Sequence, residues 1–113
     1  MKKDDRIYLD HILESLTKII QYMEDVSYEA YLTDEIRQDA VIRKMEIAGE
    51  ATKRLSLELR DKYPQIPWRA IAGMRDKLIH DYFAVDIDTV WETATKDIPG
   101  LIPEIEAVID KLG

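Results

Sequence analysis

The sequence predicts an all-α protein, an up-and-down bundle of four to five helices forming one domain over residues 1–113. Apolar residues recur at steps of three and four along most of the chain, the spacing that gives a helix one buried face. No stretch shows the every-second-residue alternation that is typical of a half-buried strand. The length of 113 residues is that of a single domain with one compact core.

The first helix is predicted over residues 4–25, with acidic residues at its positive N-terminal end. Its apolar positions are Leu9, Ile12, Leu13, Leu16, Ile19, Ile20 and Met23. Residues 26–34 then interrupt the pattern. Ser27 and Asp34 suit the caps of the helices that follow them. We expect Tyr28 and Tyr31 to cover this end of the bundle.

A long second helix is predicted over residues 34–62. Gly49 stands in its middle, where glycine costs about 1 kcal/mol relative to alanine. Its small neighbours Ala48 and Ala51 predict that another helix backbone approaches closely there. Glu50 is open to two interpretations: a solvated carboxylate, or a group that orients or neutralises an arginine in a functional site.

Pro64 and Pro67 then forbid continued helix, and Pro67 suits the first turn of a third helix over residues 67–82. Residues 81–88 are expected to form a connection. Thr89 with Glu92 three residues later fits a capping box at the start of the last helical stretch. Pro99 and Gly100 are expected to kink or break that stretch.

The charge and composition exclude several classes of protein. The net charge of −7 argues against a broad nucleic-acid-coating surface. With no cysteine, disulfides and thiolate metal sites are excluded, and the two histidines lie far apart in sequence. No apolar run is long enough to span a membrane, and the N-terminus has no signal-like apolar core. A cytoplasmic protein without membrane association is expected.

Residues 74–83 are where arginine, histidine and tyrosine crowd together, as Arg75, His80 and Tyr82. Histidine exchanges protons near neutral pH, and arginine presents a fork of donors matched to phosphate oxygens. These residue types at close spacing are suited to phosphate chemistry. Three cations and two carboxylates between Pro67 and Tyr82 also give this segment a local charge of +1, with His80 counted neutral.

Helix geometry complicates a site made from one chain. His80 lies about 140° from Arg75 around a continuous helix. Either the helix ends near His80, or two copies of the chain share the site. An interpretation without catalysis also stays open, because this spacing often occurs by chance. In that case the arginine lies on the surface, the histidine is hydrogen-bonded and the tyrosine packs its ring.

A series of landmarks in order resembles the HepT-like toxins of the HEPN ribonuclease superfamily, over nearly the whole chain. Their characteristic Arg-x4-His-x-Tyr signature matches Arg75, His80 and Tyr82 without departure. The other landmarks are residues 6–9, 38–43, 47–51, 66–68, 90–91 and 97–99.

The resemblance implies a homodimer with its cleft on the two-fold axis, and a metal-independent endoribonuclease that needs no cofactor. In such an enzyme the ribose 2′-hydroxyl attacks the adjacent phosphorus, the 5′-oxygen leaves, and a 2′,3′-cyclic phosphate remains. His80 is then the proton donor or acceptor and Arg75 the cation at the non-bridging oxygens, with Asp76 and Glu50 as supporting residues. The substrate is RNA, either tRNA or mRNA.

The resemblance also implies a role for Tyr82. In type VII toxin–antitoxin pairs of this kind, an MntA-like nucleotidyltransferase antitoxin adds AMP to the signature tyrosine. The added charge and bulk would keep RNA out of the cleft. Two alternatives stay open: a non-catalytic nucleotide- or substrate-binding partner of a nucleotidyltransferase, and a purely structural helical dimer.

Overall fold

The computed structural model describes residues 4–78 and 85–112, and all of its elements are helical, which confirms the predicted all-α class. Along the chain they are α1 (Asp5–Met23), α2 (Tyr28–Leu32), α3 (Glu35–Lys53), α4 (Leu57–Lys62), α5 (Trp68–Ala72), α6 (Met74–Leu78), α7 (Ile87–Glu92), the π-helix η1 (Thr93–Asp97) and α8 (Ile98–Leu112).

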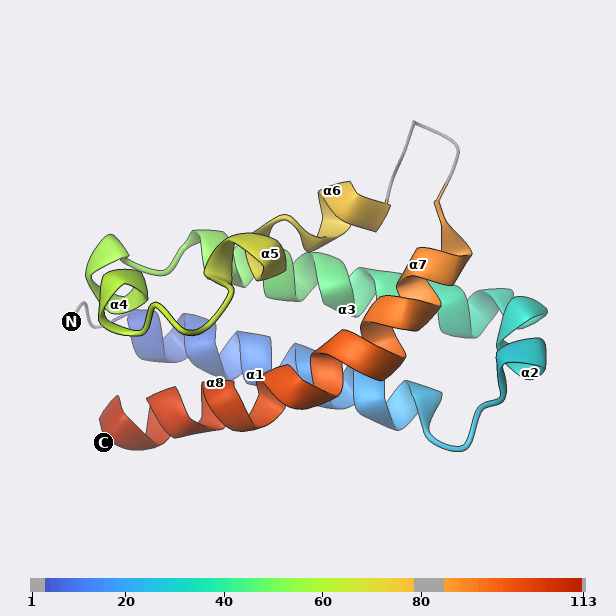
Figure 1. Cartoon of the computed structure of the whole chain (residues 1–113), viewed down its shortest axis with the longest axis horizontal. Helices are drawn as coiled ribbons and strands as arrows, with labels where there is room; N and C mark the ends of the chain where they lie inside the picture. Colours follow the sequence, from blue (N-terminus) through green and yellow to red (C-terminus); the bar gives the residue numbers. More distant parts are fainter. Residues whose placement is uncertain (1–3, 79–84, 113) are drawn as a thin grey trace.

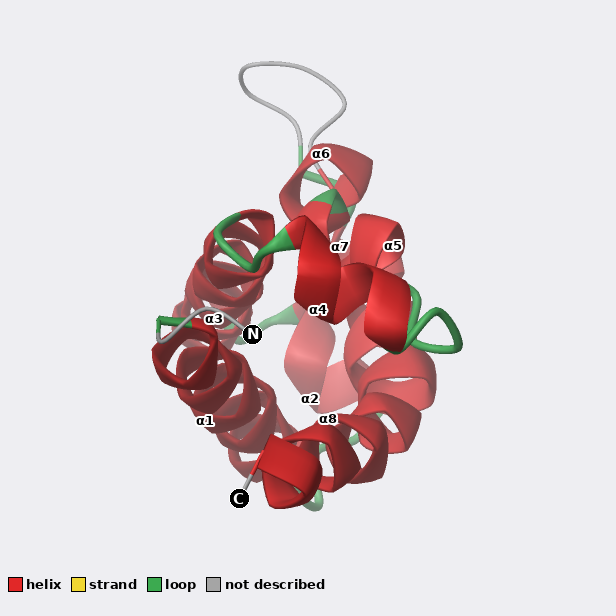
Figure 2. Cartoon of the chain, turned by 90° about the vertical axis from the view of Figure 1, so that its left-hand side faces the viewer, coloured by secondary structure: helices red, strands yellow, loops and turns green. Residues whose placement is uncertain are grey.

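These helices form an up-and-down bundle. Figure 1 shows α3 running antiparallel to α1, then α5 and α6 running back, and α7, η1 and α8 descending again. Seen from the end near α4, the four segments surround a common centre (Figure 2). The predicted bundle is therefore confirmed.

The core lies between α1, α3 and α8. The stripe predicted on the first helix is buried, with Leu9, Ile12, Leu16 and Ile19 fully inaccessible. Helices α3 and α8 pack against this stripe of α1 with buried side chains at intervals of three, four and seven residues. These are Val41, Met45 and Ala48 from α3, and Ile98, Leu101, Ile105 and Val108 from α8.

The tyrosines expected to cover one end of the bundle differ in burial. Tyr31 is fully buried, and its hydroxyl donates to the backbone oxygen of Ile87 at 2.5 Å. Burial raises the pKa of Tyr31 to about 12. Tyr28 is exposed, and its hydroxyl donates to Asp88 at 2.5 Å. Trp91 lies between the two, with ring centroids 5.2 Å from Tyr31 and 5.4 Å from Tyr28.

The second helix is shorter than predicted. It ends at Lys53, and α4 starts three residues after Arg54 with Ser56 as its N-cap. The Ser56 hydroxyl accepts from the backbone N–H of Leu59 at 3.2 Å. Ser56 is itself held by Asp5, which accepts from its N–H at 2.8 Å and its hydroxyl at 2.6 Å. This tertiary contact, made by a buried carboxylate at the start of α1, accounts for a break that periodicity did not reveal.

The third helix is also divided. Gly73 separates α5 from α6, and its N–H donates to the backbone oxygen of Arg69 at 2.9 Å. The prediction of one continuous helix over residues 67–82 is therefore wrong, because the described part of this range contains two short helices.

The last helical stretch begins earlier than predicted and stays continuous. Its N-cap is Asp86, whose carboxylate accepts from the N–H groups of Asp88 and Thr89 at 3.1 Å each, so Thr89 lies inside α7. No break occurs at Pro99 and Gly100, which lie in the first turn of α8, but the helical ribbon bends between α7 and α8 (Figure 1), and the π-helix η1 lies immediately before α8. Pro99 has no backbone N–H to donate, and the first turn of a helix is where such a residue is tolerated.

Within the described ranges, no helix is both long and apolar enough to traverse a lipid bilayer.

Candidate active site

The signature segment starts on α6, where Arg75 and Asp76 are the second and third residues. Asp76 is exposed. His80 and Tyr82 lie outside the described residues, as does the side chain of Arg75. The structure therefore gives the position of the helix that carries the signature, while the grouping of Arg75, His80 and Tyr82 stays a prediction.

Gly49 determines how closely this segment approaches α3. A Cβ atom at Gly49 would lie 3.1 Å from the backbone oxygen of Ala72 and 3.2 Å from that of Ile71. Both oxygens belong to the last residues of α5, directly before Gly73 and α6. The predicted close helix approach at Gly49 is thus confirmed. The residue that it contacts, Ala72, lies three residues before Arg75 in the chain.

The other end of α5 is fixed by Trp68. Its indole N–H donates to the backbone oxygen of Tyr63 at 2.9 Å, and its ring is buried. Ile71 and Met74 are buried below the segment. Anchors on both sides therefore hold α5 and the start of α6 against the bundle.

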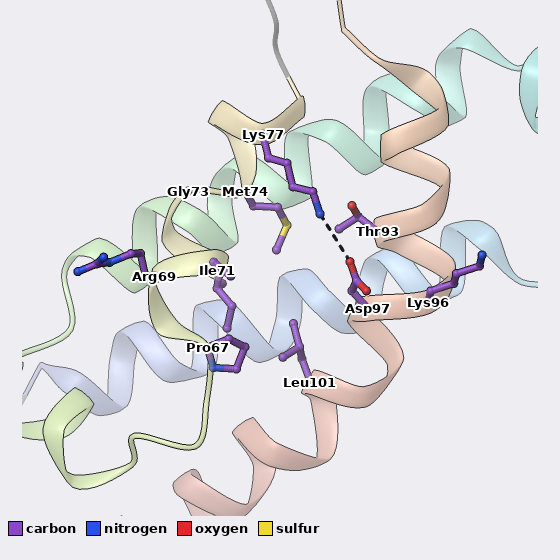
Figure 3. Close-up of a pocket in the computed structure, with 11 residues that line it drawn as sticks. Pro67, Arg69, Ile71, Gly73, Met74, Lys77, Thr93, Lys96, Asp97 and Leu101 are labelled. Atoms are coloured by element: carbon purple, nitrogen blue, oxygen red, sulfur yellow. Dashed lines mark ion pairs between the residues drawn. The ribbon is translucent and has the colours of Figure 1, made fainter.

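A cavity of about 520 Å³ opens between α5 and α6 on one side and the helical stretch of η1 and α8 on the other (Figure 3). Apolar side chains make most of its wall, and cations stand at its rim. It is lined by Pro67, Arg69, Ala70, Ile71, Gly73, Met74, Lys77, Thr93, Lys96, Asp97 and Leu101. We call it the α6 pocket, because α6 contributes both Met74 and Lys77.

Cations outnumber carboxylates among the residues that line the α6 pocket. Its lining includes three cations, Arg69, Lys77 and Lys96, and a single carboxylate, Asp97. The Lys77 ammonium lies 3.8 Å from that carboxylate across the pocket, and both side chains stay largely exposed (Figure 3). The hydrogen bond to Glu92, at 2.7 Å, raises the pKa of Lys96. Lys77 is thus paired with Asp97 and Lys96 with Glu92, and Figure 3 shows the Arg69 and Lys96 side chains directed away from the pocket.

Thr93 is the unusual polar residue of the α6 pocket. It is 4% exposed, and its hydroxyl has no hydrogen-bond partner in the described part of the protein. It is also the first residue of η1, and π-helical turns frequently occur at functional sites. Buried hydroxyls are normally paired, so this one is an exception, and its oxygen is itself inaccessible to solvent and does not open into the pocket.

Glu50, the other predicted supporting residue, is exposed in a groove between α1 and α3. Its carboxylate lies 3.6 Å from the Arg54 guanidinium, one turn further along the helix. A role towards Arg75 stays a prediction, since the Arg75 side chain lies outside the description. His11, the second histidine, lines the same groove.

The pocket itself was missed by sequence reasoning. Its lining comes from two separate segments of the chain, residues 67–77 and 93–101, and each contributes ordinary core residues. Neither pattern differs from that of a packed helix. Among residues 4–78 and 85–112, no three histidine or acidic side chains gather as a metal cluster would require.

The up-and-down bundle, with the signature segment pinned against α3, defines an all-α protein of the HEPN-like class. The model of the family described as "Ribonuclease HepT-like" matches residues 12–108. The chain belongs to this HepT-like ribonuclease family, which confirms the resemblance found in the sequence.

Named relatives agree with that assignment. A Methanocaldococcus jannaschii protein named "Gamma-glutamylcyclotransferase and putative RNase" is 49% identical over 99% of this chain, which spans 50% of that relative. A second protein of that organism, named "Putative RNase", is 45% identical over 98% of this chain and 96% of its own length. A Thermococcus cleftensis protein named "Probable ribonuclease HepT" is 42% identical over 94% and 96%, respectively. No solved structure matches the chain.

Family membership and these names support a ribonuclease function, with RNA as the substrate class.

Proposed function

We propose that the protein is the metal-independent endoribonuclease toxin of a type VII toxin–antitoxin pair. The observation that carries the proposal is the membership of the HepT-like ribonuclease family by a chain that keeps Arg75, His80 and Tyr82 at the signature spacing. The anchored position of α6 supports it, because catalytic groups need a rigid scaffold.

In this mechanism the chain works as a homodimer with two copies of the signature at one cleft. One His80 takes the proton of the ribose 2′-hydroxyl, and the oxygen attacks the adjacent phosphorus. The bond from phosphorus to the 5′-oxygen breaks, and the other His80 returns a proton to that oxygen. Arg75 stabilises the charge that develops on the non-bridging oxygens. The products are a 2′,3′-cyclic phosphate and a free 5′-hydroxyl.

The test is incubation of purified, unmodified protein with tRNA and with mRNA in EDTA, followed by end-group analysis of the fragments. His80→Ala is expected to lower cleavage by about 10²- to 10⁴-fold, the usual contribution of general acid–base catalysis. His11→Ala is the matched control, because it removes the histidine of α1 and leaves the signature intact.

Each result has a definite meaning. Cyclic-phosphate ends that disappear only with His80→Ala support the proposed chemistry. A fully active His80→Ala protein would sink the mechanism. No cleavage by folded, dimeric wild-type protein favours the second candidate, a non-catalytic helical partner of a nucleotidyltransferase, for which the acidic net charge is the favouring observation.

Control by an antitoxin is proposed to act through Tyr82. A nucleotidyltransferase would transfer AMP from ATP to the phenol oxygen, with release of pyrophosphate, and the added charge would repel RNA. Mass spectrometry after incubation with a cognate nucleotidyltransferase and ATP is expected to find the adduct on wild type and on Tyr28→Phe. Its persistence on Tyr82→Phe would place the acceptor elsewhere. Tyr28 is a suitable control, since it is an exposed tyrosine far from the signature in sequence.

A further inference from the structure

Exposed apolar side chains gather at the end of the bundle where α2 meets the first turn of α3 (Figure 1). In the described part of the chain five large apolar side chains are exposed, and three of them lie here: Tyr28, Leu32 and Ile36. Tyr28 and Leu32 are four residues apart on α2 and so share one face of that helix. Ile36 is 85% exposed. Single apolar residues on a surface need no explanation, whereas a group of them marks a site of interaction.

Trp91 extends this group on the side of α7. Its ring is half-buried and meets that of Tyr28 edge to face, with the centroids 5.4 Å apart. Together with Asp88 and Glu92 the two rings line a surface pocket of about 340 Å³. The pocket therefore offers aromatic rings and carboxylates side by side. We define the α2 face as Tyr28, Leu32, Ile36 and Trp91.

Hydrogen bonds hold the α2 face in place from two sides. Towards α7, the Tyr28 hydroxyl donates to Asp88 and the Tyr31 hydroxyl to the backbone oxygen of Ile87, at 2.5 Å each. Towards α3, the Gln38 side-chain amide donates to the backbone oxygen of Tyr31 at 2.8 Å. A surface that is already fixed loses little freedom when a partner binds, so more of the contact energy remains as affinity.

The charge around the α2 face is negative. Residues 28–37 and 86–96 contain six carboxylates and two cations, Arg37 and Lys96. Both cations are already paired, Arg37 with Asp34 at 2.9 Å and Lys96 with Glu92 at 2.7 Å. The hydrogen bond to Asp88 raises the pKa of Tyr28, and the nearby charges of Glu29 and Glu92 raise it further.

This charge selects the occupant of the α2 face. Carboxylates repel both RNA and an anionic membrane surface. A second copy that met this face across a two-fold axis would place the same carboxylates opposite each other. A basic segment of another protein avoids both problems. Its cationic side chains can lie against the rings of Tyr28 and Trp91, while its apolar side chains cover Leu32 and Ile36.

We propose that the α2 face docks a basic, amphipathic segment of a partner protein, with a cationic side chain in the pocket between Tyr28 and Trp91 and apolar side chains against Leu32 and Ile36. Arginine suits the pocket better than lysine, because a planar guanidinium can stack on an aromatic ring and pair with a carboxylate at the same time. The proposal does not depend on the ribonuclease function, since none of these residues belongs to the signature or to the α6 pocket.

NMR spectroscopy of the full chain tests the face directly. The indole N–H of Trp91 reports from the pocket, and that of Trp68, which is buried at the start of α5, is the internal control. The probe is a synthetic helical peptide with leucines on one side and arginines beside them, and two matched peptides carry glutamine or glutamate in place of every arginine. The arginine peptide is expected to shift the Trp91 signal alone. The glutamine peptide should bind about 5- to 10-fold more weakly, and the glutamate peptide should leave the signal unchanged.

The apolar part of the face is tested by Ile36→Ser. This change removes an exposed side chain, so it should weaken binding of the arginine peptide by about 3- to 10-fold and leave the melting temperature unchanged. The matched control is Leu57→Ser on α4, where the side chain is 71% exposed, and it should bind as wild type.

The charge of the face is tested by Glu29→Gln in the first turn of α2. The substitution should weaken binding of the arginine peptide by about 2- to 5-fold at low salt and have little effect at high salt, because exposed charges are screened. Glu104→Gln on α8 removes an exposed carboxylate elsewhere and should have no effect.

Several results would overturn the proposal. One is an arginine peptide that leaves the Trp91 signal in place or binds no better than the glutamine peptide. Another is equal binding by Ile36→Ser and Leu57→Ser. Spermidine that binds as tightly as the peptide, with the same affinity for Ile36→Ser, would make the pocket a site for free polyamines. A dimer that Ile36→Ser dissociates in sedimentation would assign the face to contact between copies, and a Trp91 shift caused by single-stranded RNA would assign it to RNA.

Discussion

The bundle core and the signature segment are built in opposite ways. In the core, α1 and α3 have 19 residues each and α8 has 15, and their buried stripes interlock. Near the start of the signature, α5, α6 and η1 have 5 residues each and line the α6 pocket. We therefore expect the long helices to supply most of the stability, and substitutions in the short helices to affect it less.

The largest effect is expected in the core. Leu16→Ala removes a fully buried side chain of α1 and should lower the free energy of unfolding by about 2–5 kcal/mol. Leu57→Ala, at a residue that is 71% exposed, should change it by less than about 0.5 kcal/mol. Urea unfolding followed by circular dichroism measures both. Equal losses for the two variants would contradict the division of roles.

A smaller loss is expected where the core is joined to α4. Asp5→Ala leaves the N–H and hydroxyl of Ser56 without their acceptor and should cost about 1–3 kcal/mol. The control is Asp10→Ala in the same helix, which breaks an exposed pair with Arg6 worth at most about 1 kcal/mol. If the same unfolding measurement ranks Asp10→Ala as the costlier change, the link between α1 and α4 is not structural.

Two buried threonines, one in the core and one beside the signature segment, test the comparison of these regions. Thr52 is fully buried in α3, and its hydroxyl donates to the backbone oxygen of Ala48 at 2.8 Å. Thr52→Val should therefore cost about 1 kcal/mol. Thr93→Val removes a hydroxyl that has no partner in the described residues and should leave the melting temperature unchanged or higher. A clear loss for Thr93→Val would mean that its hydroxyl contributes to the stability of the fold.

The same contrast accounts for what the sequence could predict. The stripe of Leu9, Ile12, Leu16 and Ile19 follows from local spacing, so the bundle and its core helices were predictable. The break before α4 was not, because it depends on Asp5 reaching Ser56 across 51 residues of chain. The α6 pocket depends likewise on η1 facing α5 and α6, which no local pattern encodes.

Gly49 links the two regions, and replacing it with alanine is expected to have a small net effect on stability. Alanine gains about 1 kcal/mol of helix propensity over glycine. At Gly49 the new Cβ would lie 3.1 Å from the backbone oxygen of Ala72, so much of this gain is offset as α5 moves outward. Gly100→Ala is the matched control, since its Cβ would meet nothing within 4 Å, and it should show the full gain.

The two glycines should also differ in activity. A shift of α5 by a few tenths of an ångström is passed through Gly73 to α6, where both Arg75 and the wall of the α6 pocket are carried. Gly49→Ala should therefore lower RNA cleavage while the fold stays stable, because catalysis is more sensitive to such displacements than folding is. Gly100→Ala should cleave as wild type. Equal stabilisation and equal activity of the two variants would mean that the contact at Gly49 does not position the signature segment.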